Sequence, residues 1–298
     1  MTDVVVGFDV GGTKTAVAVE TVDGAPVGKF EVPSLSWSAA PASGAAGWIA
    51  ERVRAAVPAE QRVVALAAGV HGCDTNEDGR EITEALAVEG YPAVVVNDAA
   101  LLVVGAGLDH GIGVVAGTGA IAVGQDRDGV YLFAGGWGSV LGDDAGAPGL
   151  VREATRAALA AYDAGRPDDG LLRALLEAFG VDRPDRLARA VNDVPARDNW
   201  APKAPAVFAA ADRGSGLAAA VVVAAAGHLV ALVGHLVRRG ALGSDVVASG
   251  GVFVHQPRLF TEFRRQLARA QPGLTAQLLD CAPVDGALRL AHRLYETG

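Results

Sequence analysis

The pattern of apolar and polar positions passes through the same order of elements twice. Each half opens with three short runs of β-branched and apolar residues, which predict three strands joined as hairpins. Helix-like stripes and further apolar runs then alternate. The predicted strands cover residues 4–9, 15–20, 28–32, 63–70 and 93–97, then 113–116, 120–124, 130–134, 245–248 and 275–279. The predicted helices include residues 45–57, 99–107, 258–270 and 284–295, and helices dominate residues 149–239.

This repetition predicts two α/β domains, residues 1–112 and 113–298, with a boundary near residues 109–113. A chain of 298 residues is long enough for two ordinary domains. Two such halves place a cleft between them, and α/β proteins bind ligands in clefts at the ends of strands. We therefore expect the glycine-rich segments that follow strands to face a ligand.

Two of these glycine-rich segments predict phosphate-binding β-hairpins. Glycine lets backbone N–H groups approach a polyphosphate closely. Gly7 and Gly12 have Walker A spacing, but Thr13 stands where the lysine should be, and a strand pattern follows instead of a helix. Residues 117–122 resemble a dinucleotide fingerprint and likewise run into a strand pattern.

Composition narrows the class of protein. A hydrophobic fraction of 51% and a charged fraction of 20% describe a globular chain. The net charge of -9 argues against nucleic acid and anionic membranes as partners. Cys73 and Cys281 are too far apart for a CxxC motif and suit buried positions. Lysine is rare, and Lys14 at the tip of the first glycine turn is either a phosphate contact or a solvated turn charge.

We expect a cytoplasmic protein, because the N-terminus has no basic region followed by an apolar stretch of signal-peptide length. Residues 218–237 are about as long and apolar as a membrane span, but they are mostly Ala and Val and include His228 and His235. They predict a buried or interfacial helix. The two histidines share one helix face without an acidic residue, which argues against a metal site.

Six segments in this order carry a resemblance to a known family. Residues 9–15, 97–99 and 117–119 resemble successive signatures of the actin-like sugar kinase and chaperone ATPase superfamily. Residues 135–144, 249–252 and 283–287 make the chain similar to the N-acetylglucosamine kinase family, which also contains the BadF/BadG-type ATPases. The resemblance implies two ribonuclease H-like (actin-like ATPase) domains with an interdomain cleft, and a last helix that packs back on the first domain. It also implies ATP and Mg²⁺ as cofactors and a homodimer.

For ATP, the resemblance implies two phosphate turns on opposite sides of the triphosphate and an adenosine loop at residues 249–252, which alone would be typical of an ordinary turn. The implied ATP-binding residues are Gly11, Gly12, Thr13, Lys14, Thr15, Gly117, Thr118, Gly119, Ser249, Gly250, Gly251 and Val252. Asp9, at the mouth of the first turn, either holds Mg²⁺ partly through water or caps the turn.

Asp98 is the candidate catalytic residue. It ends an apolar strand and precedes a predicted helix, which aims a carboxylate at the cleft, where it can accept the proton of a sugar hydroxyl. An aspartate is also a favoured helix N-cap, so the residues alone leave both interpretations open. The resemblance implies that Asp98 is the general base.

For the sugar, the resemblance implies contacts from Asn97, Asp98, Thr118, Gly136, Trp137 and Asp143. Trp137 is flanked by glycines, which would leave an indole face accessible as a platform, although a core position is the alternative. The family usually has an asparagine in the loop after the third strand, but here residues 34–38 contain none, so Ser36 or Ser38 is expected to substitute. The second phosphate turn also ends in Ala120 rather than serine.

These observations predict a carbohydrate kinase that phosphorylates the 6-hydroxyl of N-acetylglucosamine. Glucosamine and N-acetylmuramic acid kinases are the alternatives among enzymes, because the usual asparagine is missing. An ATP-driven switch that acts on a protein partner is the alternative from another class, although the two cysteines do not match an iron–sulfur site. A non-catalytic sugar or nucleotide sensor is a third. Zinc-binding repressor relatives are disfavoured, because clustered cysteines are missing.

Overall fold

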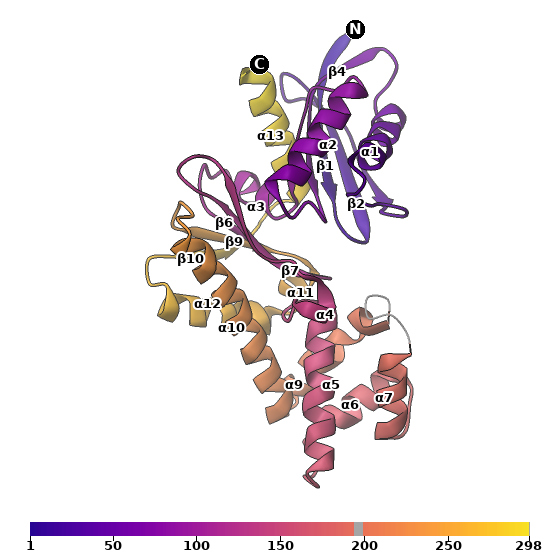
Figure 1. The fold of residues 1–298 in the computed structure, drawn as a ribbon, viewed down its shortest axis with the longest axis vertical. Helices are drawn as coiled ribbons and strands as arrows, with labels where there is room; N and C mark the ends of the chain where they lie inside the picture. Colours follow the sequence, from indigo (N-terminus) through magenta and orange to yellow (C-terminus); the bar gives the residue numbers. More distant parts are fainter. Residues whose placement is uncertain (194–198, 298) are drawn as a thin grey trace.

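The computed structural model describes residues 1–193 and 199–297. The predicted second domain, 113–298, includes residues 194–198 and Gly298, which lie outside this description. The described chain contains two five-stranded sheets, joined in the middle of the molecule, and a helical lobe beyond the second sheet (Figure 1).

The first sheet has the strand order β3-β2-β1-β4-β5. The strands β1, β2 and β3 form an antiparallel meander, and β4 and β5 add to β1 in parallel. Their bounds are Thr2–Val10 for β1, Lys14–Thr21 for β2, Pro26–Pro33 for β3, Gln61–Val70 for β4 and Ala93–Asn97 for β5.

The second sheet repeats this arrangement in the order β10-β9-β6-β7-β8. Again three strands are antiparallel and two are parallel to the first of them. Their bounds are Ile112–Ala116 for β6, Ala120–Gln125 for β7, Tyr131–Gly135 for β8, Asp245–Ser249 for β9 and Thr275–Leu278 for β10. The mixed α/β fold and the duplication that the sequence predicts are therefore confirmed.

Helices cover both faces of the first sheet, because β1 is apolar on both. Alternate residues of a strand point to opposite faces. The even-numbered residues Val4, Val6 and Phe8 belong to a core shared with α1 (Ala42–Ala56) and α2 (Asn76–Val88). Val5 belongs to a second core, shared with α13 (Pro283–Thr297).

The last helix, α13, returns from the second half to lie against the first sheet (Figure 1). A Cβ atom on Gly7 would lie 2.8 Å from the backbone nitrogen of Leu288, so only glycine allows this approach. Similarly, a Cβ atom on Gly286 would lie 2.3 Å from the carbonyl oxygen of Leu101 in α3 (Ala100–Gly105). The 283–287 segment is thus a packing contact that joins the two halves.

The remaining helices enclose the core of the second half. They are α4 (Gly138–Leu141), α5 (Ala147–Asp163), α6 (Leu171–Phe179), α7 (Pro184–Asn192), η1 (Ala201–Lys203), α9 (Ala204–Asp212), α10 (Gly216–Arg238), α11 (Gly251–His255) and α12 (Pro257–Ala270). Within the described residues, α10 alone is long and apolar enough to cross a membrane by length and composition. It packs against α12, α9 and α5, which is the behaviour of a core helix.

Candidate functional site

The carboxylate of Asp98 lies at the junction of β5 and α3. The N-cap of α3 is Ala99, and no side chain caps that helix. Asp98 Oδ1 instead accepts a hydrogen bond from the backbone nitrogen of Ala99 at 2.9 Å. The alternative role of Asp98 as a helix cap is therefore not realised.

The electrostatic surroundings of Asp98 raise its pKa. Burial is the main cause, and the negative charge of Asp74 adds to it. The charge of His71 and the Ala99 N–H oppose the shift. A carboxylate held in this way is a stronger proton acceptor than an ordinary aspartate, which suits a general base.

Asp9, at the end of β1, lies close enough to Asp98 for the two carboxylates to interact. Its pKa is raised from 3.8 to about 7, first by burial and then by the charge of Asp98, while Lys14 opposes the shift. The turn that follows is closed by the backbone, with Gly11 N donating to Lys14 O at 3.0 Å. A buried carboxylate whose pKa is raised by a neighbouring negative charge would be stabilised in its charged form by a bound cation.

The turn after β4 brings two residues into this group that sequence reasoning missed. Asp74 raises the pKa of both Asp98 and Asp143, whereas His71 lowers it. Asp74 also faces the second half, because a Cβ atom on Gly136 would lie 3.7 Å from Asp74 Oδ1. The signal for His71 and Asp74 in the sequence is their place directly after the predicted strand 63–70, since polar residues after a buried parallel strand often face a ligand.

Asn97 has no free position for a sugar, contrary to its predicted direct contact. Its side chain is 2% exposed. Its Nδ2 donates to Cys73 O at 3.0 Å and to Asp74 Oδ1 at 3.1 Å, and its Oδ1 accepts from Ala99 N at 2.9 Å. Because every part of the amide is engaged, Asn97 supports its neighbours instead.

In the second half, Asp143 lies against the second glycine turn. A Cβ atom on Gly119 would lie 2.9 Å from Asp143 Oδ2, so this carboxylate lies directly against the turn. The backbone of Asp143 is left-handed, with φ 53°, and its buried Oδ1 has no hydrogen-bond partner among the described residues. Burial raises the pKa of this carboxyl. Strained backbone and an unpaired buried acceptor are typical of a ligand site.

The second glycine turn also adjoins the predicted adenosine loop. A Cβ atom on Gly117 would lie 3.6 Å from Gly251 N, and one on Gly250 would lie 2.5 Å from Ala116 O. Gly250 has φ 102°, which favours glycine. The segment is therefore not a free turn, since Gly250 is the N-cap of α11, in which Val252 is buried. Ser249 ends β9 beside it.

The first glycine turn is only partly open. Lys14 Nζ pairs with Glu31 at 2.7 Å on the surface. Thr15 is fully buried, and its hydroxyl lies 2.9 Å from Ser34 Oγ, so the side chain of Thr15 does not face a ligand. Gly12 and Thr13 form the tip between β1 and β2, where Gly12 is half-buried and Thr13 is exposed.

The loop after β3 is held by tryptophans. Trp37 Nε1 donates to His71 O at 3.0 Å, and Trp48 Nε1 donates to Leu35 O at 3.1 Å. Ser36, at φ 58°, is exposed, and its hydroxyl donates to Leu35 O at 2.6 Å. Trp37 thus anchors the loop against Trp48, and Ser36 and Asp143 are the two non-glycine residues with positive φ in the described chain.

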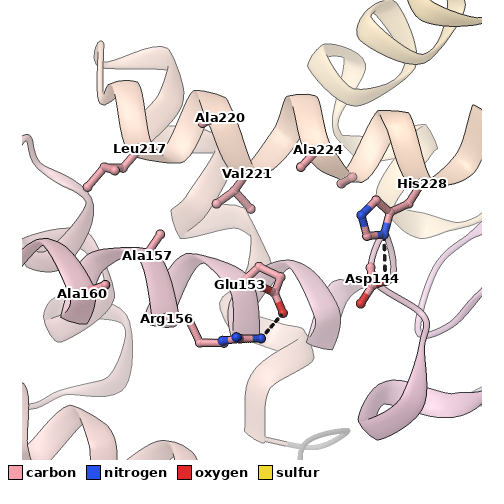
Figure 2. Close-up of a pocket in the computed structure, with 11 residues that line it drawn as sticks. Asp144, Glu153, Arg156, Ala157, Ala160, Leu217, Ala220, Val221, Ala224 and His228 are labelled. Atoms are coloured by element: carbon pink, nitrogen blue, oxygen red, sulfur yellow. Dashed lines mark hydrogen bonds and ion pairs between the residues drawn. The ribbon is translucent and has the colours of Figure 1, made fainter.

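Trp137 is not a core residue, since 73% of it is exposed. A cavity with a volume of about 490 Å³ lies elsewhere, between α5 and α10 (Figure 2). Its walls are mainly small apolar side chains, and Asp144 at one end is its single link to the predicted site. His228 and His235 do not share a ligand, because His228 pairs with Asp144 and His235 with Arg238.

Comparison with known proteins assigns the chain to a family. Residues 6–288 match the BadF/BadG/BcrA/BcrD ATPase family. The chain belongs to this family. An N-acetyl-D-glucosamine kinase of Dictyostelium discoideum is 25% identical over 314 aligned positions, which cover 97% of this chain and 98% of that protein. An N-acetylmuramic acid/N-acetylglucosamine kinase of Clostridium acetobutylicum is 35% identical over 103 positions, 33% of each chain.

Solved structures agree on the fold of this family member. A candidate N-acetylglucosamine kinase from Chromobacterium violaceum superposes with a TM-score of 0.74, at 26% identity, covering 97% of this chain and 98% of that one. A ROK family glucokinase from Streptomyces griseus, solved with glucose and AMPPNP, gives a TM-score of 0.59 at 20% identity, covering 99% and 100%. The predicted family and the actin-like ATPase fold are confirmed.

Proposed function

We propose that this protein is an ATP-dependent kinase of an amino sugar, with the 6-hydroxyl of N-acetylglucosamine as the acceptor. The full-length similarity to an N-acetyl-D-glucosamine kinase supports the substrate class. The observation that carries the chemistry is the cluster of Asp98, Asp9 and Asp74, because it puts a carboxylate with a raised pKa beside a second one at the mouth of a glycine turn.

In the proposed reaction, Asp98 accepts the proton of the sugar hydroxyl. The sugar oxygen forms a bond to the γ-phosphorus as the bond from that phosphorus to the β–γ bridging oxygen breaks, which leaves ADP. The charge of His71 lowers the pKa of Asp98 against the effect of burial, and so favours the ionised form that accepts a proton. Asn97 supports Asp98 by fixing the Asp74 turn and the Ala99 N–H.

Asp9 is the proposed contact for Mg²⁺, which neutralises phosphate charge when bound. No group of three or more metal-ligating side chains occurs among the residues described. This fits Mg²⁺, which is commonly held by one or two carboxylates together with substrate phosphates and water. The raised pKa of Asp9 is the mark of a carboxylate that a cation would stabilise in its charged form.

The ATP contacts are proposed for the tip of the first turn, Gly11 to Lys14, and for the second turn, Gly117 to Gly119. Ser249, Gly250 and Gly251 would pack beneath the adenine, with Val252 buried behind them. Thr15 contributes by holding Ser34 at the start of the loop after β3. The division into domains 1–112 and 113–298, the cytoplasmic location and the homodimer remain parts of this proposal.

The charge of the site bears on which amino sugar is accepted. Asp74, Asp98 and Asp143 are close enough for Asp74 to raise the pKa of the other two. A sugar that carries its own carboxylate, such as N-acetylmuramic acid, would add a fourth negative charge. The charge of the site therefore favours N-acetylglucosamine and glucosamine over N-acetylmuramic acid, and the similarity to an N-acetyl-D-glucosamine kinase favours the first of these two.

The test is ADP formation with Mg·ATP across N-acetylglucosamine, glucosamine, N-acetylmuramic acid, N-acetylmannosamine and glucose, with the phosphorylated position assigned by NMR. We expect turnover that requires an amino sugar and produces a 6-phosphate. Hydrolysis of ATP at the same rate with every sugar and with none would contradict the proposal and favour an ATP-driven switch.

A further inference from the structure

We propose that Arg152 is a positioning residue that fixes the sugar loop, defined as residues 137–144, and thereby sets the affinity for the sugar. This inference rests on the proposed function. The loop contains α4, in which no residue is buried. Val140 and Leu141 are 86% and 84% exposed, and Trp137 is 73% exposed. Because apolar packing does not hold these residues, their placement has to come from polar contacts.

Arg152, in the second turn of α5, supplies those contacts. Its Nη1 donates to the carbonyl oxygen of Ser139 inside α4, and its Nη2 donates to Asp144 Oδ1 at the end of the loop. The guanidinium therefore grips the loop at two places five residues apart in the chain. Its side chain is only 20% exposed, and a planar fork of donors is suited to such a two-point contact.

A second helix, α10, also contacts Asp144. The other carboxylate oxygen of Asp144, Oδ2, lies 2.7 Å from His228 Nδ1 of α10. Figure 2 marks this contact with a dashed line. Asp144 is thus held between α5 and α10, which form the walls of the cavity described above. His228 therefore contributes to holding Asp144 in place.

The residue that benefits is Asp143, next to Asp144 in the chain. Its left-handed backbone is unfavourable for a non-glycine residue and persists only where neighbouring contacts enforce it. Gly149 of α5 lies directly beneath it, since a Cβ atom there would lie 2.3 Å from Asp143 O. Loss of the Arg152 contacts would release Asp143 and Trp137 together, whereas the glycine turns that are proposed to bind ATP would keep their own backbone contacts.

The experiment compares Arg152→Ala with Arg156→Ala, its matched control. Arg156 lies one turn further along α5 and pairs, like Arg152, with Glu153, but among the described residues no hydrogen bond or ion pair joins it to residues 137–144. Hydrogen–deuterium exchange of peptides covering residues 137–146 reports the loop without any need for activity. Steady-state kinetics then give KM for the sugar and for ATP separately. Arg152→Lys tests rescue by the charge alone.

We expect faster exchange of the loop in Arg152→Ala, with a sugar KM raised about tenfold, the loss expected from a charged hydrogen bond. The KM of this variant for ATP should stay within about twofold of the wild-type value. Arg152→Lys should recover part of the sugar affinity, and Arg156→Ala should match the wild type in both measurements. If Arg152→Ala does not fold, Asp144→Asn removes the same ion pair at constant size.

Unchanged exchange in both variants would overturn the inference, as would faster exchange with an unchanged sugar KM. Equal effects of Arg152→Ala and Arg156→Ala would also overturn it, because they would trace the effect to Glu153. A wild-type protein without sugar-dependent turnover would defeat the proposed function, but the exchange measurement would still decide whether Arg152 holds the loop.

Discussion

The Asn97 amide donates a hydrogen bond to the Asp74 carboxylate, with 3.1 Å between Nδ2 and Oδ1. This contact ties the end of β5 to the turn after β4, so that Asp98 and Asp74 are held at the same edge of the first sheet. A buried, fully bonded amide fixes geometry more firmly than two exposed charges could. The spacing of negative charge around the proposed base is therefore built into the fold.

Substitutions of Asp74 and His71 should shift the pH profile of kcat/KM in opposite directions. A base must be ionised to act, so kcat/KM for the sugar should fall on the acid side as Asp98 takes up a proton. Asp74 raises the pKa of Asp98 and His71 lowers it. Asp74→Asn should therefore move the acid limb to lower pH, and His71→Gln should move it to higher pH. Profiles measured between pH 5 and pH 9 would contradict this account if both variants moved the limb in the same direction.

The raised pKa of Asp9 predicts a link between pH, stability and metal. Folded Asp9 holds its proton up to about pH 7, whereas its ordinary pKa is 3.8. The stability that this proton contributes is present below pH 4 and is lost as pH rises toward 7. In Mg²⁺-free buffer, Asp9→Asn should thus gain Tm relative to the wild type between pH 5 and pH 8. A constant difference in Tm across that range would argue against the raised pKa.

The same substitution should weaken the use of Mg·ATP. With Asp9 neutral, we expect the KM for Mg·ATP to rise about 10–100-fold, the range seen when an outer partner of a metal is removed. The sugar KM should change little. Glu31→Gln is the control, because Glu31 also faces Lys14 but lies on the surface. An equal loss in Glu31→Gln would point to Lys14 rather than to Asp9.

Much of this could be predicted from the sequence, and the reasons are physical. The repeated order of strands and helices follows from local apolar periodicity, so both sheets were predicted to within a few residues. The glycine turns were predicted because few other residues allow such close backbone approach. Asp98 was predicted from its place at a strand end.

What could not be predicted depends on contacts between distant segments. Asp74 and His71 enter the site because β4 lies between β1 and β5, and their only local signal is that they follow a predicted strand. Asn97 was expected to face the sugar, but its neighbours in the turn after β4 use its amide. The contacts that hold Asp144 join three segments, so neither Arg152 nor His228 could be assigned from its own surroundings in the chain.

Exposure of Trp137 separates a binding role from a structural one. Because 73% of Trp137 is exposed, Trp137→Ala should leave Tm within about 1 °C of the wild type, since surface substitutions are usually within about 0.5 kcal/mol. Its sugar KM should rise up to about tenfold, as for an anchoring aromatic. Leu141→Ala is the control, at 84% exposure on the same loop. A fall in Tm without a change in KM would make Trp137 structural.

Close packing of α13 predicts a sharp loss of stability. Gly286→Ala would place a methyl group 2.3 Å from Leu101 O, against rigid backbone. We expect a loss of about 1–3 kcal/mol in the free energy of unfolding, measured by urea titration. Gly273→Ala should be near neutral, because a Cβ atom there meets nothing within 4 Å. Equal stability of the two variants would show that α13 does not pack as described.

The most direct test of the central claim is the sugar-dependent rate of ADP formation in Asp98→Asn, measured with Mg·ATP and N-acetylglucosamine. Asparagine keeps the size of the side chain and its contact with Ala99 N but cannot take the proton. The account predicts a fall in kcat/KM of about 10²–10⁴-fold with ATP binding unchanged. Sugar-dependent turnover close to that of the wild type would contradict the assignment of Asp98 as the base.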